Sequence, residues 1–249
     1  MSIYITGDVH GLTDRLEPGF YHELDALTKE DYLIICGDFG FVWNGDETEQ
    51  DELHDLEDRP FTTLFVDGNH ENFDLLKQYP TIPWHGGLVQ TIRPSVLHLL
   101  RGEIYELEGL RFFTMGGASS HDVSDGILEP DDPGFSRRYR TLYKQNALFR
   151  VNHISWWQEE LPDQEEYRRA RDSLARANWQ VDYIITHCAP TSVQDRLGKG
   201  WYKADHLTDF LDEVAQRCRV QHWFFGHYHM DGHLGDRFIY LYEELLQLT

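Results

Sequence analysis

Five short polar motifs, each placed where an apolar run ends, constrain this 249-residue chain more than any other feature. The runs Ser2–Thr6, Tyr32–Cys36 and Phe61–Val66 predict buried strands, and a glycine follows each of them within two residues. Amphipathic stretches separate these runs, and this alternation is typical of α/β layers. We therefore predict an α/β fold of the α+β type, with a two-sheet β-sandwich flanked by helices. Because no linker or internal repeat is visible, we expect residues 1–249 to form a single domain.

Further elements follow from periodicity and turn residues. Apolar positions at helical spacing predict a helix within residues 13–28. Residues 118–140 are polar and rich in Gly, Pro and Asp, which predicts a loop, and a later helix is expected after the N-cap Asp163. Close-set runs joined by turn residues predict an antiparallel meander of four strands: Leu88–Ile92, Val96–Leu100, Ile104–Leu107 and Leu110–Thr114. The remaining predicted elements are strands at Val181–Thr186, Val220–Phe225 and Phe238–Tyr242 and a helix near 203–217.

Composition excludes several classes of protein. Only 22 Lys and Arg stand against 43 Asp and Glu, so the net charge of −21 disfavours a protein that lies along a nucleic acid. The three cysteines are too few and too scattered for a disulfide framework. No run is long and apolar enough to span a bilayer, and the first residues resemble a strand rather than a signal peptide. We expect a cytoplasmic protein that makes no membrane contact.

The polar motifs carry the side chains that bind metals. They supply carboxylates, imidazoles and one amide oxygen, and no thiolate, a mixture that suits Mn²⁺, Fe or Zn²⁺. Because functional groups in open α/β sheets gather at the carboxyl ends of strands, the five motifs are expected to converge. Glycines that precede the ligands fit turns in which the backbone approaches a metal closely. The candidate residues are Asp8 and His10 (GDVH), Asp38 (GDFG), Asn69 and His70 (GNHE), His187 (THCAP), and His227 and His229 (GHYH).

The series GDVHG, GDFG, GNHE, THCAP and GHYH, spread over residues 7–229, resembles the calcineurin-like metallophosphoesterase superfamily. The resemblance implies a β-sandwich that holds two metal ions. It assigns Asp8, His10 and His229 to the first ion, and Asn69, His187 and His227 to the second. Asp38 is expected to bridge the ions, and His70 is expected to face the substrate as the catalytic residue.

The chemistry that this resemblance implies is direct hydrolysis of a phosphoester. A hydroxide between the two ions is the expected nucleophile, and His70 is expected to protonate the leaving group or to stabilise negative charge. Mn²⁺ is the expected metal, with Fe, Zn²⁺ or Ni²⁺ as alternatives.

One departure from the resemblance narrows the substrate. Ser/Thr protein phosphatases of this superfamily carry GDxVDRG at the second motif, where the Asp orients the catalytic His and the Arg binds phosphate. Phe41 and Val42 occupy those two positions here. We therefore expect a phosphomonoesterase or phosphodiesterase with a small phosphoester or nucleotide substrate, and not a long nucleic acid. A protein phosphatase, a nuclease and a non-catalytic scaffold remain the alternatives. The substrate-binding residues and the oligomeric state are not defined by the sequence.

Other features have competing explanations. The nine histidines outside the motifs are expected to be structural, although His121 lies in a long loop beside Asp122. Residues 137–140 contain three arginines that would fit a phosphate, but an ion pair with the acidic stretch 129–132 is the simpler expectation. The aromatic pairs Trp156-Trp157 and Trp201-Tyr202 would suit either a stacked base or ordinary packing. The acidic segment 46–58 is expected to be a solvated helix or loop.

Overall fold

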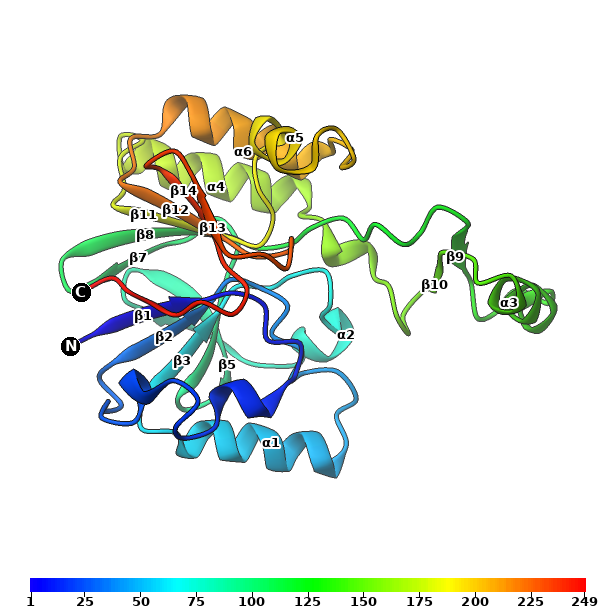
Figure 1. Cartoon of the computed structure of the whole chain (residues 1–249), viewed down its shortest axis with the longest axis horizontal. Helices are drawn as coiled ribbons and strands as arrows, with labels where there is room; N and C mark the ends of the chain where they lie inside the picture. Colours follow the sequence, from blue (N-terminus) through cyan, green and yellow to red (C-terminus); the bar gives the residue numbers. More distant parts are fainter.

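Two β-sheets packed face to face form the centre of the protein, and helices cover both outer surfaces (Figure 1). The computed structural model describes residues 1–249. The predicted fold class is therefore confirmed. The sheets lie between one helix layer that contains α1 and another that contains α4, α5 and α6 (Figure 1).

The first sheet holds seven strands, and its central strands β1, β2, β3 and β6 are parallel. Residues of β2 and β3 are buried on both faces, as expected for parallel strands covered on two sides. In spatial order the strands are β15 (Leu246–Gln247), β1 (Ile3–Thr6), β2 (Tyr32–Ile35), β3 (Thr62–Phe65), β6 (Val96–Leu99), β5 (Gly87–Arg93) and β4 (Thr81–Trp84).

The second sheet holds six strands around the parallel trio β8, β11 and β12. Its spatial order is β13 (Gly232–Leu234), β14 (Phe238–Tyr240), β12 (His222–Phe225), β11 (Tyr183–Thr186), β8 (Leu110–Met115) and β7 (Ile104–Leu107). The helices are α1 (Glu47–Asp58), α2 (Phe73–Leu76), α3 (Phe135–Lys144), α4 (Gln164–Arg176), α5 (Thr191–Gly198) and α6 (His206–Arg217).

Three buried hydrophobic clusters hold these layers together. The cluster between the sheets joins Ile34 of β2 to Phe112 of β8 and Phe224 of β12. A second cluster packs the outer face of the first sheet against α1 through residues such as Leu53. The third packs the second sheet against α4, α5 and α6, with Phe210 among its members. Alternate residues of one strand therefore serve two different cores.

Two predicted elements differ from the observed ones. Residues 13–28 form only two short 3-10 helices, Thr13–Leu16 and His22–Leu24. Pro18 and Gly19 lie between them and interrupt the helical spacing. The predicted meander is wrong as a single unit, because β5 and β6 pair in the first sheet whereas β7 and β8 pair in the second. The chain passes from one sheet to the other at Gly102, which has a φ of +77°.

The capping prediction is confirmed at α4. The Asp163 side chain accepts a hydrogen bond from the backbone N–H of Glu166, and the Glu166 side chain accepts one from Asp163. The segment 46–58 forms α1, which buries Leu53 and Leu56 on one face and leaves most of its acidic residues on the other. No helix of the protein combines the length and apolar character that crossing a membrane requires.

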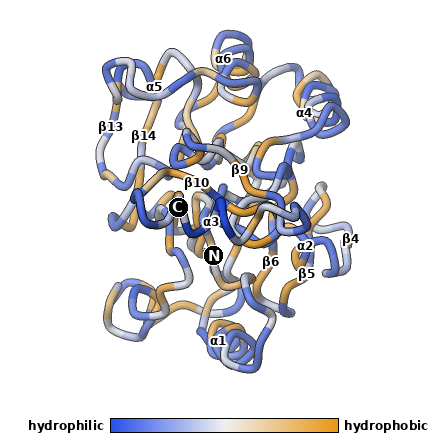
Figure 2. The backbone as a smooth tube through the Cα atoms, turned by 90° about the vertical axis from the view of Figure 1, so that its right-hand side faces the viewer, coloured by the Kyte–Doolittle hydropathy of each residue, from blue (hydrophilic) through white to orange (hydrophobic).

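Residues 122–152, which we call the arm, project from the side of the body (Figure 1). The arm contains the short parallel pair β9 (Gly126–Leu128) and β10 (Phe149–Val151), joined by α3. Figure 2 looks along the arm, with α3 nearest the viewer. The loop prediction for residues 118–140 is therefore only partly correct, because β9 and the beginning of α3 lie within them.

Candidate metal centre

The carboxyl ends of five parallel strands bring all the predicted site residues to one edge of the sandwich. β1, β2 and β3 of the first sheet and β11 and β12 of the second precede the five motifs. Residues from both sheets therefore share one site, as the strand-end argument predicted.

The residues assigned to the first ion form a compact cluster together with the expected bridging carboxylate. One ligand atom from each of Asp8, His10, Asp38 and His229 lies within 4.8 Å of the others. The Nε2 atoms of His10 and His229 are 2.9 Å apart, and Nε2 of His229 lies 3.3 Å from the Asp8 carboxylate. His229 is exposed, so solvent reaches this side of the centre.

The residues assigned to the second ion are more deeply buried. His187 Nε2 lies 3.2 Å from the Asp38 carboxylate and 3.3 Å from Oδ1 of Asn69. The rings of His187 and His227 are 4.9 Å apart between centroids. Asp38 contacts residues of both sets, because it also lies 3.7 Å from His10 Nε2. This is the position that a bridging ligand needs.

A backbone carbonyl on the side away from the site fixes the orientation of the His187 ring. Its Nδ1 lies 2.8 Å from the carbonyl oxygen of Cys36, which assigns an N–H to Nδ1 and turns Nε2 toward the site. Burial opposes protonation of the ring, but the neighbouring Asp38 carboxylate outweighs burial and raises the pKa of His187. A divalent cation at this position would replace that proton.

Four of the candidate ligands have a strained backbone. The φ angles of His10, Asp38, His227 and His229 are +54°, +45°, +70° and +47°. Residues other than glycine adopt this left-handed region at a cost of about 1–3 kcal/mol, and such residues concentrate at functional sites. The strain directs side chains from neighbouring positions of one turn into the same centre.

Close packing, more than positive φ, explains the glycines of the motifs. A Cβ atom at Gly68 would collide with the Asp38 side chain, and one at Gly226 would collide with Asp8. Only Gly37 among the motif glycines that precede a ligand also has a positive φ, of +96°. The predicted role of these glycines is thus refined: Gly68 and Gly226 make room for a carboxylate, and Gly37 makes room for the His187 ring.

Backbone hydrogen bonds hold the two carboxylates in place. The Asp8 carboxylate accepts from the N–H of His227 at 2.9 and 3.0 Å, and Asp38 Oδ1 accepts from the N–H of His70 at 2.8 Å. Glu71 is a supporting residue that the sequence argument missed, because its buried carboxylate accepts from the N–H of Phe39 directly after Asp38. The sequence signal was available, because Glu71 is the last residue of the GNHE motif.

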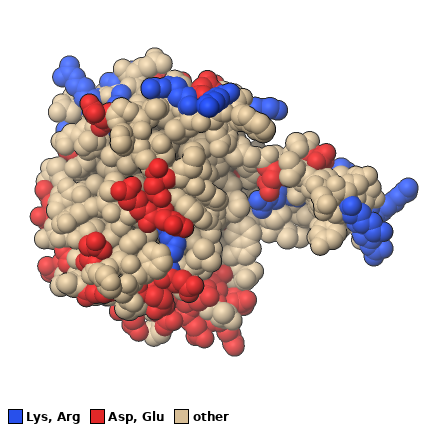
Figure 3. Space-filling view, in the orientation of Figure 1, with Lys and Arg blue, Asp and Glu red and all other residues tan.

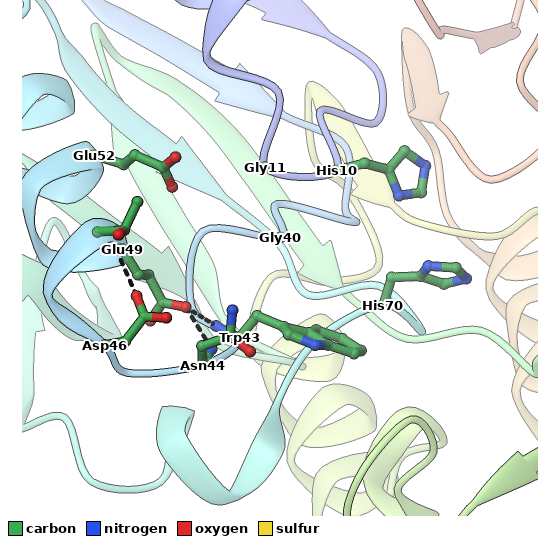
Figure 4. Close-up of a pocket in the computed structure, with 10 residues that line it drawn as sticks. His10, Gly11, Gly40, Trp43, Asn44, Asp46, Glu49, Glu52 and His70 are labelled. Atoms are coloured by element: carbon green, nitrogen blue, oxygen red, sulfur yellow. Dashed lines mark hydrogen bonds between the residues drawn. The ribbon is translucent and has the colours of Figure 1, made fainter.

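His70 faces the open side of the centre, next to His10 (Figure 4). Burial lowers the pKa of the His70 ring, so the metal-free protein holds a neutral imidazole at neutral pH. Phe41 and Val42, at the positions of the absent Asp and Arg, are buried in the core and do not reach the ring. Instead, Nη2 of Arg150 in the arm lies 3.5 Å from His70 Nε2.

His121 also belongs to this edge, although the sequence argument grouped it with structural histidines. It follows β8, a sixth strand that ends here, and its Nε2 lies 2.8 Å from that of His227. Burial is the main cause that lowers the pKa of both rings. The pair Gly116-Gly117, shortly before His121, was the available sequence signal.

The donor set fits two divalent cations. Imidazole nitrogens and carboxylate oxygens converge, and the amide of Asn69 is oriented by its Nδ2, which donates to Ser120 Oγ at 3.4 Å, so that Oδ1 faces His187 Nε2 at 3.3 Å. His187 is likewise held with Nε2 facing the site, where a cation would replace its proton. A centre of this composition suits hard or borderline metals.

Among the other sequence hypotheses, the arginines of α3 form one weak ion pair, between Arg138 and Asp132 at 3.7 Å. The aromatic pairs behave differently from one another, since Trp157 is buried in a core cluster whereas Trp201 is 90% exposed. Cys36 and Cys188 are buried with raised pKa values caused by burial, so neither is suited to act as a nucleophile.

The fold and the convergent ligand set define a metallophosphoesterase, and comparison with known families agrees. The family model for calcineurin-like phosphoesterases matches residues 1–231, and the chain belongs to this family.

Several curated relatives carry a more specific name. The lariat debranching enzyme of Caenorhabditis briggsae is 24% identical over 264 residues, which cover 92% of this chain and 46% of that protein. The enzyme of Drosophila melanogaster is 22% identical over 271 residues, covering 92% and 43%. Lariat debranching enzyme A of Xenopus laevis is 28% identical over 145 residues, covering 52% and 26%. The chain spans less than half the length of these relatives.

Proposed function

We propose that this chain is a two-metal phosphodiesterase whose substrate carries an aromatic ring, as a nucleotide does. The observation that carries the proposal is a pair of cavities that flank the candidate metal centre. One is lined by His10 and His70 and the other by His121. A phosphate bound between them would have room for an ester group on each side, whereas a monoester needs only one.

The chain supplies two sets of ligands that share Asp38, and we propose that they hold two Mn²⁺ ions. When bound, such ions lower the pKa of a water molecule and neutralise the charge of a phosphoryl group. His70 is the proposed donor to the phosphoester, and because its pKa is lowered it would act as a neutral N–H donor.

The cavity beside His121 is suited to a ring. It measures about 580 Å³, and its lining includes Trp201, Tyr202 and Lys203. The ring of Tyr202 already packs against His121 at 5.0 Å between centroids, while Trp201 is 90% exposed and free to stack. A nucleobase in this cavity would lie close to a phosphate at the metal centre.

The cavity beside His70 is different in character. It measures about 490 Å³ and is bordered by acidic residues of and before α1, among them Asp46 and Glu52 (Figure 4). A second phosphate would be repelled here. We therefore propose that this side takes a small uncharged or cationic ester group.

A second candidate function is cleavage of a branched RNA. The relatives named lariat debranching enzymes favour it, and so does the basic helix α3, whose charged residues are all Arg or Lys. The acidic surface around α1 disfavours cleavage of RNA, because it would repel the phosphates of the RNA backbone (Figure 3). Binding of a branched RNA that weakens steeply with salt would support this candidate.

The test is turnover of matched phosphoesters by the Mn²⁺-loaded protein. We expect thymidine 5′-(p-nitrophenyl phosphate) to be cleaved faster than methyl p-nitrophenyl phosphate, and both faster than p-nitrophenyl phosphate. Faster cleavage of the monoester would overturn the diester proposal, and equal rates for the two diesters would overturn the ring site. The same preparation, assayed for metals, should contain two Mn²⁺ per chain. A cytoplasmic location stays a prediction.

A further inference from the structure

The base of the arm places a guanidinium beside the candidate catalytic histidine. Arg150 lies in β10, and its Nη2 atom is 3.5 Å from His70 Nε2. The side chain is 19% exposed, so it lies largely within the protein yet borders the open face. Residue 150 is 80 positions from His70 in the sequence, and only the return of the arm to the body brings the two together.

The guanidinium is held in a fixed orientation. Asp122, at the opposite root of the arm, accepts from Nε of Arg150 at 2.8 and 2.9 Å, and its Oδ2 forms an ion pair with Nη2 at 2.8 Å. Nη1 donates to the carbonyl oxygen of Ser155 at 3.3 Å. This two-pronged pairing with a carboxylate uses the geometry in which arginine differs from lysine. One N–H of Nη2 remains for the space beside His70.

Two hydrogen-bond donors face the same space once His70 carries its proton on Nε2, as donation to a substrate from that atom requires; in the other tautomer Nε2 would itself accept from Arg150. Arginine has no acceptor atom, and a His70 ring that donates to substrate from Nε2 has none at that atom either. Two donors without an acceptor between them would be a poor arrangement in a closed structure. An anionic oxygen beside both atoms satisfies them together.

We propose that Arg150 is a further catalytic residue, which donates to a phosphoryl oxygen of the substrate beside His70, and that Asp122 is the residue that positions it. The inference rests on the proposed phosphodiesterase function. In the reaction a water oxygen adds to phosphorus and the ester P–O bond breaks. The leaving oxygen takes a proton from water, and His70 and Arg150 donate hydrogen bonds and keep their protons throughout. Arg150 thus supplies the phosphate contact that Val42, buried in the core, does not make.

This assignment gives the arm a role in catalysis. The two roots of the arm, Asp122 and Arg150, are joined to each other and contact the site, whereas α3 lies away from it (Figure 1). A displacement of the arm would move the guanidinium away from His70.

The test compares three variants of the Mn²⁺-loaded protein on a nitrophenyl phosphodiester. Arg150→Ala should lower kcat/KM by about 100-fold, the size seen when one donor to a transition-state oxygen is removed. Arg150→Lys should recover only part of this loss, because the ammonium lacks the planar fork. Guanidinium chloride added at millimolar concentration should restore Arg150→Ala at least 10-fold relative to equal sodium chloride. Exposed Arg140→Ala on α3 is the matched control and should match wild type.

A binding measurement, which requires no turnover, separates a catalytic role of Arg150 from a structural one. Inorganic phosphate should bind to metal-loaded Arg150→Ala about 10-fold more weakly by calorimetry, with unchanged metal content and melting temperature. Asp122→Asn should give a smaller loss that does not add to the loss in Arg150→Ala. An active wild type with no loss in Arg150→Ala, or a loss that guanidinium leaves unchanged, would overturn the role of Arg150. An inactive wild type would instead overturn the proposed function.

Discussion

The body and the arm differ in what holds them in shape. The body buries its central strands on both faces, and residues such as Ile34 of β2 and Leu53 of α1 are 0% exposed. In the arm, α3 buries no residue, and Tyr143 is 68% exposed. Hydrophobic burial is therefore the main stabilising term of the body, whereas the arm buries few apolar side chains, Leu128 and Val151 among them, and adds the pairing of β9 with β10 and of Asp122 with Arg150.

The two regions also differ in charge. Acidic side chains gather on the body around α1, while α3 at the end of the arm carries Arg and Lys (Figure 3). The candidate metal centre lies where the two regions meet, since Arg150 of the arm contacts His70 of the body. The body therefore supplies the metal ligands on well-packed strands. The arm adds Arg150, a charged group that the sandwich alone would not place at the metal centre.

The largest effect should come from the residue shared by both metal sets. Asp38→Ala removes a carboxylate that contacts His10 and His187, so neither ion keeps its full set of ligands. We expect kcat/KM to fall by at least about 1,000-fold, which corresponds to about 4 kcal/mol of transition-state stabilisation. Metal analysis should show fewer than two ions per chain.

Asp131→Ala is the matched control for this loss, because Asp131 is an exposed carboxylate of the arm. It should keep both metals and full activity. Substantial activity in Asp38→Ala would contradict the bridging assignment, and equal losses in the two variants would contradict the division between body and arm.

The next largest effect concerns folding, at a buried ion pair of the body. Asp67 is 1% exposed and contacts Arg101 Nε at 2.8 Å and His98 Nε2 at 3.1 Å. Asp67→Asn leaves the buried guanidinium without its counter-charge and should lower the free energy of unfolding by about 3–5 kcal/mol. Urea titration measures this change. Asp132→Asn, which removes an exposed arm pair at 3.7 Å, should cost less than about 1 kcal/mol.

The same ion pair predicts a direction for the pH dependence. Burial opposes ionisation of Asp67, but Arg101 and His98 outweigh burial and hold its pKa well below the usual range. The folded state therefore binds this proton less readily than the unfolded state. The stabilisation is present above about pH 4, the pKa of an unfolded aspartate, and is lost as the pH falls further. The stability difference between wild type and Asp67→Asn should shrink over that range; a constant difference would contradict it.

The smallest effect should come from an apolar side chain of the arm. Leu53→Ala in α1 removes a fully buried side chain and should cost about 2–5 kcal/mol. Leu148→Ala in the arm removes a side chain that is 51% exposed and should change stability by less than about 0.5 kcal/mol. Similar costs at both positions, measured by urea unfolding, would mean that the arm packs on a partner or on the body in solution.

Much of the body was predictable from local pattern. A strand that is buried on both faces leaves a continuous apolar run, and a tightly packed turn with positive φ requires glycine, as at Gly37, so β2 and the GDFG motif are both readable. The strands of the supposed meander were recognised, but their division between two sheets was not. Sequence periodicity reports the exposure of a strand and contains no information about which sheet it joins. That residues 1–249 form one domain stays a prediction.

The sequence by itself determined the class of fold and the eight residues of the candidate centre, because ligand types placed after buried strands are a local signal. Only the tertiary structure decided which other side chains lie next to these eight residues. Arg150 and His121 belong to no motif, and they reach His70 and His227 because the arm leaves and rejoins the body at the same edge. Contacts between residues 80 or 106 positions apart depend on the path of the whole chain, which no local pattern records.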